Sequence, residues 1–164
     1  MKPFRAARGG EVVARLDPAE AGIVGLLLDQ LEQLLDADDV VSDPVLARLL
    51  PDGHRNDPEL AADYRELTES SLREGKTDDL ALVRASLPTG GGEVRLDRDQ
   101  AAAWLRSTND LRLALGTRLD ITEDTEPPDD PADERHQQLA VYYWLTALQG
   151  SLVDAMAAGR GGRS

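Results

Sequence analysis

Apolar residues recur every three or four positions in three long stretches of the chain, which is the spacing of one face of an α-helix. The first stretch, which begins at Pro18, has the apolar positions Val24, Leu27, Leu28, Leu31, Leu34 and Leu35. The second, residues 98–119, has Ala101, Trp104, Leu105, Thr108, Arg112, Leu115 and Leu119 along one stripe. The third, residues 131–157, has Val141, Leu145, Leu148, Leu152 and Met156. We therefore predict three long amphipathic helices.

The middle of the chain predicts shorter helices. Residues 38–58 are typical of a connection that contains one short helix, begun by Asp43-Pro44 and ended by Pro51. A further helix begins near Asp57. We expect Glu74-Gly75-Lys76 to break it and Thr77 or Asp78 to cap a second, shorter helix that runs to Leu87.

Two similar sequences each lead into a predicted helix: "GGEVVARLDPAEA" at residues 9–21 and "GGEVRLDRDQA" at residues 91–101. Both indicate a strand, then an Asp that caps a helix, at Asp17 and Asp97; Glu20 is placed to complete a capping box. Gly9-Gly10 predicts a hairpin turn. We interpret the repeat as one structural unit used twice, with the capped strand ends side by side; the alternative is coincidence in a chain rich in Ala, Arg, Asp and Gly.

The predicted fold is mainly α: a single-domain bundle of about five to six helices over residues 1–158, followed by a flexible tail at 159–164. A small antiparallel β-sheet, made of the N-terminal hairpin and one short strand, is expected from residues 3–7, 11–16 and 93–96.

Composition and charge limit the classes of function that we expect for the chain. The 164 residues contain 41% apolar and 4% aromatic residues, which favours helices over a β-sandwich. Cysteine is absent, which excludes disulfides and thiolate metal sites. Without a signal-peptide pattern or a membrane-length apolar run, we expect a cytoplasmic protein that binds no membrane. The net charge of −13 opposes broad binding to phosphate backbones, yet the opening segment is basic, with Lys2, Arg5, Arg8 and Arg15.

Few residues suggest a site, and each has a structural alternative. Arg112 lies on an apolar stripe, where it could anchor an anion or a partner beside Asn109; a structural ion pair with an acid from another helix is the favoured reading. Gly116 and Gly150 inside helices suggest close helix crossings. Asp133 and His136 could share a metal, but a solvated helix start is favoured, and His54 is the other histidine.

Larger motifs give no chemistry. Residues 57–87 could form a helix-turn-helix, but the second helix would present acids to phosphates. The glycines of "TGGGEV" enter a strand, whereas phosphate loops enter a helix. Neither a catalytic Ser/His arrangement nor a cofactor motif stands out, so no cofactor is expected.

The stretches "WLRSTNDLRLALGTRLDI" (104–121) and "YYWLTALQGSLVDAM" (142–156), with the opening 9–35, resemble an actinobacterial domain-of-unknown-function family named for AosR-type oxidative-stress transcription regulators. The resemblance covers essentially the whole chain. It implies a transcription regulator that acts partly through contacts with transcription proteins, and it supplies no catalytic residues. A redox-sensing member would need thiols, so any sensing is expected in a partner, and mild peroxide should leave this chain nearly unchanged.

The leading hypothesis is therefore a non-enzymatic regulatory protein that contacts transcription proteins, with DNA as a second and weak target, through Arg5, Arg8 and Arg15. The alternative is a protein-only adaptor or scaffold that uses acidic helical faces. An uncharacterised enzyme ranks last and would require a deep pocket lined by Arg112, Asn109 and Trp104.

Overall fold

The computed structural model describes residues 2–36 and 58–161, and these residues form four long helices and a three-stranded sheet. In chain order the elements are β1 (Lys2–Ala6), the 3-10 turn η1 (Arg8–Gly10), β2 (Val12–Leu16), α1 (Pro18–Leu35), α3 (Pro58–Ser86), β3 (Gly92–Leu96), α4 (Arg98–Arg118) and α5 (Glu134–Gly161). The prediction of a mainly helical fold with a small sheet is confirmed, but the described residues contain four helices instead of about five to six, partly because α3 is one unbroken helix where two were predicted. The short helix expected within residues 38–58 lies outside the described residues.

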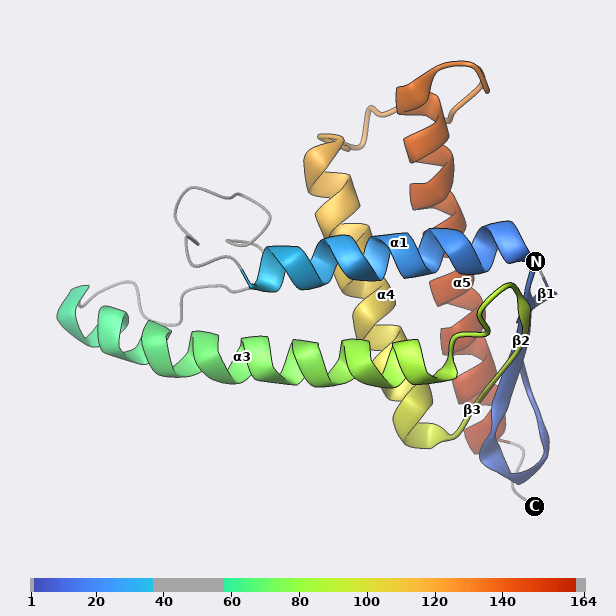
Figure 1. The fold of residues 1–164 in the computed structure, drawn as a ribbon, viewed down its shortest axis with the longest axis horizontal. Coiled ribbons are helices and arrows are strands. Elements are labelled where there is room, and N and C mark those ends of the chain that lie inside the picture. The colour runs from blue at the N-terminus through green and yellow to red at the C-terminus, as the bar shows by residue number, and fades with distance from the viewer. Residues whose placement is uncertain (1, 37–57, 162–164) are drawn as a thin grey trace.

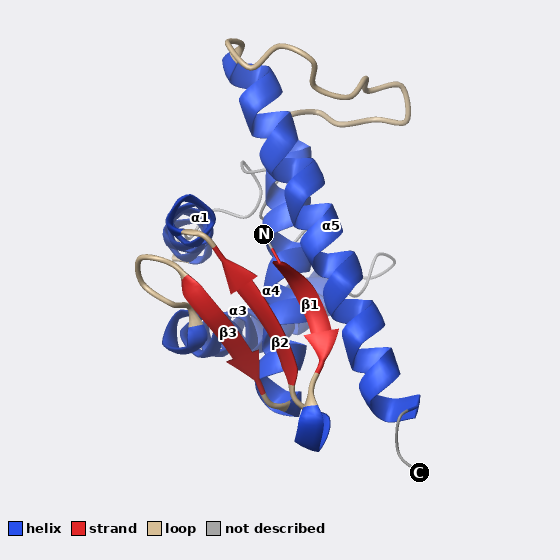
Figure 2. Ribbon diagram, turned by 90° about the vertical axis from the view of Figure 1, so that its right-hand side faces the viewer, coloured by secondary structure: helices blue, strands red, loops and turns tan. Residues whose placement is uncertain are grey.

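The helices form two pairs that cross each other. Figure 1 shows α1 and α3 side by side, with α4 and α5 running across them as the second pair. Helix α4 contacts both α3 and α5 and is therefore the central helix of the bundle. The sheet lies against one side of the helices, and α5 follows β1 along its length (Figure 2). Among the described residues, no helix is both long and apolar enough for a bilayer crossing.

The sheet has the strand order β1-β2-β3, and both pairs are antiparallel. Leu16 at the end of β2 is opposite Gly92 at the start of β3, while Leu96 is opposite Val12. The expectation that the two capped strand ends lie side by side is therefore wrong. Because the strands run in opposite directions, Asp17 and Asp97 lie at opposite ends of the strand pair.

Both predicted Asp caps are present and both form capping boxes. The Asp17 carboxylate accepts a hydrogen bond from the Glu20 backbone N–H at 2.8 Å, and the Glu20 carboxylate accepts one from the Asp17 N–H at 2.8 Å. Asp97 and Gln100 make the same reciprocal bonds at 2.8 and 2.9 Å. Each box satisfies backbone donors that the first helical turn leaves without partners. The repeated sequences thus encode the same strand–cap–helix unit twice.

The core fills the space between the inner face of the sheet and the four helices. The inner face presents Val12, Ala14, Leu16, Val94 and Leu96, all buried. Helices α1 and α5 add their predicted leucine stripes. Trp104 of α4 is 1% exposed, packs edge-on against Phe4 with ring centroids 5.9 Å apart, and donates a hydrogen bond to the Ser86 hydroxyl at 2.7 Å.

Helix α3 is continuous from Pro58 to Ser86, so the predicted break at Glu74-Gly75-Lys76 is wrong. Thr77, expected to cap a new helix, instead donates its hydroxyl to the Arg73 carbonyl one turn earlier, as a residue inside a helix does. The loss of about 1 kcal/mol for a helical glycine is small enough for packing against α4 to outweigh. The continuous helix leaves no turn for a helix-turn-helix.

The glycines differ in their roles. Gly9 and Gly10 have φ angles of 77° and 80° in the hairpin connection, as predicted, although the connection is a longer 3-10 turn closed by Ala7 N–H to Glu11 carbonyl at 2.8 Å. A Cβ at Gly116 would lie 3.2 Å from the Tyr142 ring, which confirms a close α4–α5 crossing. A Cβ at Gly150 would meet nothing within 4 Å among the described residues, so the same prediction fails there.

The segments around α5 differ in detail from expectation. Helix α5 runs to Gly161, into the segment where the tail was predicted, and residues 162–164 lie outside the described part. The His136 imidazole accepts a hydrogen bond from the Asp130 backbone N–H at 3.0 Å, and the His136 backbone N–H donates to the Asp133 carboxylate at 3.1 Å. His136 therefore fastens the acidic linker to the start of α5. The described residues contain no cluster of three or more metal-binding side chains, and His54 lies outside them.

Candidate functional site

The outer face of the sheet gathers the basic residues of the opening segment. Side chains of residues directly opposite each other in a sheet share a face. Arg5 is opposite Val13, which is opposite Arg95, and Lys2 is opposite Arg15, which is opposite Glu93. A register shift between Lys2 and Arg5 inserts an extra residue in β1, and this irregularity keeps both cations on the outer face.

Arg8 extends this surface at the hairpin turn. It lies in η1 and lines a shallow hollow together with Arg5 and Arg95. We call Lys2, Arg5, Arg8, Arg15 and Arg95 the basic face. Its five cations outnumber its two carboxylates, Glu11 and Glu93, on a chain whose net charge is −13. The structure thus brings Arg5, Arg8 and Arg15 onto one surface.

The cations of the basic face differ in their pairing. Arg95 donates to Glu93 at 3.0 Å and to Glu11 at 3.3 Å, and these hydrogen bonds, the one to Glu93 first, raise the pKa of Arg95. In the described part of the chain, the side chains of Lys2, Arg5, Arg8 and Arg15 make no hydrogen bond or ion pair. These four charges are available to an anionic partner. Val13 lies among them yet is 4% exposed, because the aliphatic stems of long basic side chains can cover apolar surface.

Two members of the basic face were not among the contact residues predicted from the sequence: Arg95, and Lys2, which the sequence showed only as part of the basic opening segment. Arg95 could have been found, because it holds the same place in the repeated "Arg-Leu-Asp" as Arg15 does. Once the two units pair as strands, these arginines must share the outer face. Lys2 depends on the irregular register of β1, for which the sequence has no signal.

Arg112 and Asn109 lie elsewhere, between α4 and α5. Arg112 donates to the Thr146 hydroxyl at 3.0 Å and to the Gln149 side chain, and its guanidinium stacks 5.5 Å from the Tyr142 ring centre. The favoured ion pair with an acid is therefore wrong within the described residues. Arg112 is half-buried, and neutral oxygens of α5 satisfy its donors.

A polar pocket of about 260 Å³ lies beside Arg112, lined also by Asn109, Gly116, Asp120 and Tyr142. Asn109 is exposed at its rim. Trp104 lies in the core instead, bonded to Ser86. The three residues named for an enzyme pocket therefore do not converge on one pocket.

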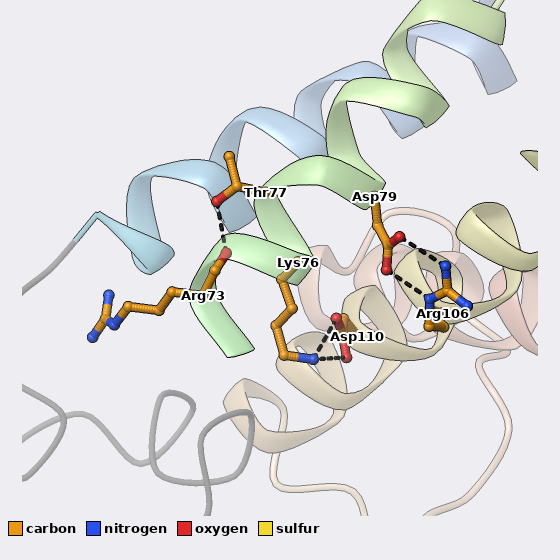
Figure 3. Close-up of polar contacts among 6 residues, drawn as sticks. All are labelled: Arg73, Lys76, Thr77, Asp79, Arg106 and Asp110. Atoms are coloured by element: carbon orange, nitrogen blue, oxygen red, sulfur yellow. Dashed lines mark hydrogen bonds and ion pairs between the residues drawn. The ribbon is translucent and has the colours of Figure 1, made fainter. Parts of the chain in front are cut away.

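The charged contact that sequence reasoning missed is Lys76–Asp110, between α3 and α4. Figure 3 shows the Lys76 ammonium between both carboxylate oxygens of Asp110, at 2.8 and 3.0 Å, with Arg106 paired to Asp79 one turn away. Burial raises the pKa of Asp110, while Lys76 acts against that rise. The contact is structural and explains why α3 continues through Gly75. One sequence feature could have revealed this contact: a row of small and polar residues is spaced as a second face of α4, at Ala103, Ser107, Asp110 and Ala114.

The site is thus a solvent-facing basic sheet surface on a protein whose net charge is negative. Comparison with known proteins places the chain more specifically. Residues 1–156 match the model of a domain of unknown function, DUF2017, and the chain belongs to that family. The family resemblance noted in the sequence is thereby confirmed.

Relatives carry a functional name. A Mycobacterium leprae protein named after the oxidative stress regulator AosR is 33% identical over 94% of this chain and 83% of its own length. The oxidative stress regulator AosR of Mycobacterium bovis and that of Mycobacterium tuberculosis are each 36% identical over 72% of this chain. That alignment spans 60% of each of those two relatives, which is less than two thirds. No solved structure gives a significant match.

Proposed function

We propose that the chain is a non-enzymatic regulator in the oxidative-stress response that acts by binding another macromolecule through its basic face. Transcription proteins are the first candidates for that partner, and DNA is the second. The names of the AosR relatives support the regulatory role. The single observation that carries the mode of action is a set of four cations on one face that have no partner among the described residues, on a chain with net charge −13.

Electrostatics supports binding at this face. Opposite charges at an interface speed encounter and fix orientation more than they add affinity. On a strongly acidic protein, most of the surface repels an anionic partner, so the basic face selects the approach. Arginine can also bind carboxylates or phosphates through two parallel hydrogen bonds, which adds geometric specificity.

Charge reversal tests the proposal. In cells whose own copy is deleted, a double variant Arg5→Glu/Arg15→Glu should fail to restore the transcript changes that follow peroxide treatment, while the wild-type chain restores them. The matched control is Arg118→Glu/Arg135→Glu, which changes the net charge equally at exposed sites on α4 and α5. Circular dichroism should show that both doubles fold. Full restoration by the basic-face variant would refute the proposal.

A further inference from the structure

An apolar groove lies next to the basic face, at the end of the sheet where the hairpin turns. Its volume is about 290 Å³. The hairpin turn, the start of α4 and the end of α5 line it, through Gly10, Val12, Arg98, Ala101, Ala102, Ala155, Met156 and Gly159. Apart from Arg98, these side chains are small or apolar. The groove has room for one large apolar side chain.

The groove and the basic face both border the hairpin turn. Gly10 lines the groove, and Arg8 of the basic face stands two residues earlier in the same 3-10 turn. Arg98, exposed at the start of α4, adds a cation at the groove itself. Among the described residues, neither arginine side chain has a hydrogen-bond or ion-pair partner. An occupant of the groove would therefore meet unpaired cations.

We infer that this surface docks an acidic segment of a partner protein that inserts one apolar side chain into the groove and places carboxylates on Arg5, Arg8 and Arg98. The inference rests on the proposed function and names the chemistry of its partner. The anchor supplies affinity, and the arginines supply orientation. Burying one apolar side chain is expected to strengthen binding roughly ten- to hundredfold.

The surface suits a protein segment better than duplex DNA. Apart from Arg98, the lining of the groove is carbon, which offers nothing to a phosphate or a sugar hydroxyl. Within the described part of the chain, the basic face offers four cations without a partner, whereas duplex binding commonly uses about six to ten phosphate contacts. Phe4, the one aromatic residue of the three strands, is buried, so the sheet also lacks the stacking platform that single strands need. Exposed Asp17 stands at the end of the sheet away from the groove, where a long duplex would meet it and a short segment at the groove would not.

Three fluorescent probes separate these alternatives with the full chain at near-physiological salt. The first is a short synthetic peptide with one Phe flanked by Asp and Glu, the second is the same peptide with Gly in place of Phe, and the third is a short random DNA duplex. Ala102→Leu fills the groove from a half-buried position, and Ala140→Leu makes the same change at an exposed site on α5. Arg5→Glu/Arg8→Glu removes the cations.

We expect the Phe peptide to bind at least tenfold more tightly than the Gly peptide and more tightly than the duplex. Ala102→Leu should weaken the Phe peptide about tenfold and leave the Gly peptide unchanged, because only the anchor loses its place. Ala140→Leu should change neither. Arg5→Glu/Arg8→Glu should weaken the binding of both peptides. The salt dependence of that binding should not become steeper, because the cations that attract the carboxylates are gone.

Equal binding of the two peptides by the wild-type chain would overturn the anchor without relying on any variant. Tighter binding of the duplex, or no binding of the Phe peptide at about 1 mM, would overturn the choice of an acidic protein segment. Those results leave the proposed function standing, because DNA remains open to it. The proposed function itself fails in the cellular charge-reversal test, so the two failures can be told apart.

Discussion

The two strand–cap–helix units share their local structure but differ in what surrounds them. Asp17 and Asp97 are 80 positions apart, and the same offset relates the helices that they cap. The buried positions Ala21, Val24, Leu28, Leu31 and Leu34 of α1 correspond to the buried Ala101, Trp104, Thr108, Leu111 and Ala114 of α4. One stripe is thus buried in both helices. Helix α4 also buries Ala103, Ser107 and Asp110, whose counterparts Ile23, Leu27 and Gln30 remain partly or fully exposed.

The cap ends of the two units also differ. The loop before β3 closes over the first cap, where a Cβ on Gly91 would lie 2.7 Å from the Pro18 nitrogen. The hairpin turn does not close over the second cap in the same way: Gly10 has nothing within 4 Å of its would-be Cβ, and it lines the apolar groove with Arg98. The comparison teaches that a repeated sequence repeats a local fold, while neighbouring elements decide which copy keeps an open surface.

Alanine at one glycine of each connection, Gly91 in the loop before β3 and Gly10 in the hairpin turn, should separate the closed cap from the open one. Gly91→Ala combines a φ of 92° with a contact against backbone, so we expect a loss on the order of 3 kcal/mol. Gly10→Ala has a φ of 80° but open space, and the left-handed conformation alone costs about 1 kcal/mol. Urea denaturation of both variants gives the comparison. Equal losses would mean that the loop does not seal the first cap.

The second face of α4 can be tested through its charge. Lys76→Met leaves the Asp110 carboxylate, 10% exposed, without its cation, and we expect a loss of about 2 kcal/mol at neutral pH. Arg84 joins α3 to Asp29 and Glu32 of α1 at an exposed site. Arg84→Ala should therefore lower the free energy of unfolding by less than about 1 kcal/mol. If the two losses match, burial does not make the α3–α4 ion pair the more important of the two for stability.

The pH dependence of Lys76→Met has a definite sign. Burial raises the folded-state pKa of Asp110 above its ordinary value of 3.8. The folded state then holds the proton more tightly than the unfolded state, so the contribution of Asp110 to stability falls as pH rises from about 3.8 through the folded-state pKa. Without Lys76 that pKa rises further. The destabilisation by Lys76→Met should therefore be small near pH 4 and grow toward neutral pH; a pH-independent loss would contradict this account.

The sequence predicted what local chemistry decides. Caps at Asp17 and Asp97, the glycine hairpin turn and the leucine stripes follow from hydrogen bonding and periodicity within a few residues. The continuity of α3 does not follow from local chemistry, because Lys76 contacts Asp110 only in the folded bundle. The second face of α4 was also missed, since its Ser107 and Asp110 read as surface residues until α3 covers them. For the basic face, the sequence supplied Arg5, Arg8 and Arg15, and the strand register added Lys2 and Arg95.

The two capping boxes should be close to equal in strength because their geometry is the same. Asp17→Ala and Asp97→Ala should each lower the free energy of unfolding by about 1 kcal/mol. Glu20 makes one difference, since its carboxylate also accepts a hydrogen bond from the Trp144 indole at 3.1 Å, which ties the first cap to α5. Glu20→Gln should retain most of the box, because a Gln side chain can accept the same backbone N–H, as Gln100 does in the second box. If neither Asp variant shifts the urea midpoint, the caps do not stabilise the repeated unit.

The smallest effect on stability is expected at Met156, which lines the groove at the open cap. The sequence suggested that peroxide would leave both fold and binding nearly unchanged. The expectation for the fold stands, because Met156 is only half-buried. Its sulfoxide should lower the free energy of unfolding by less than about 0.5 kcal/mol, as changes outside the fully buried core usually do. Binding is a different matter, because oxidation turns a flexible apolar side chain into a polar one within the groove. We therefore expect peroxide to weaken the Phe peptide several-fold and the Gly peptide hardly at all, with Met156→Leu removing the difference. An equal effect on both peptides, or one that persists in Met156→Leu, would show that the methionine does not lie where the anchor binds.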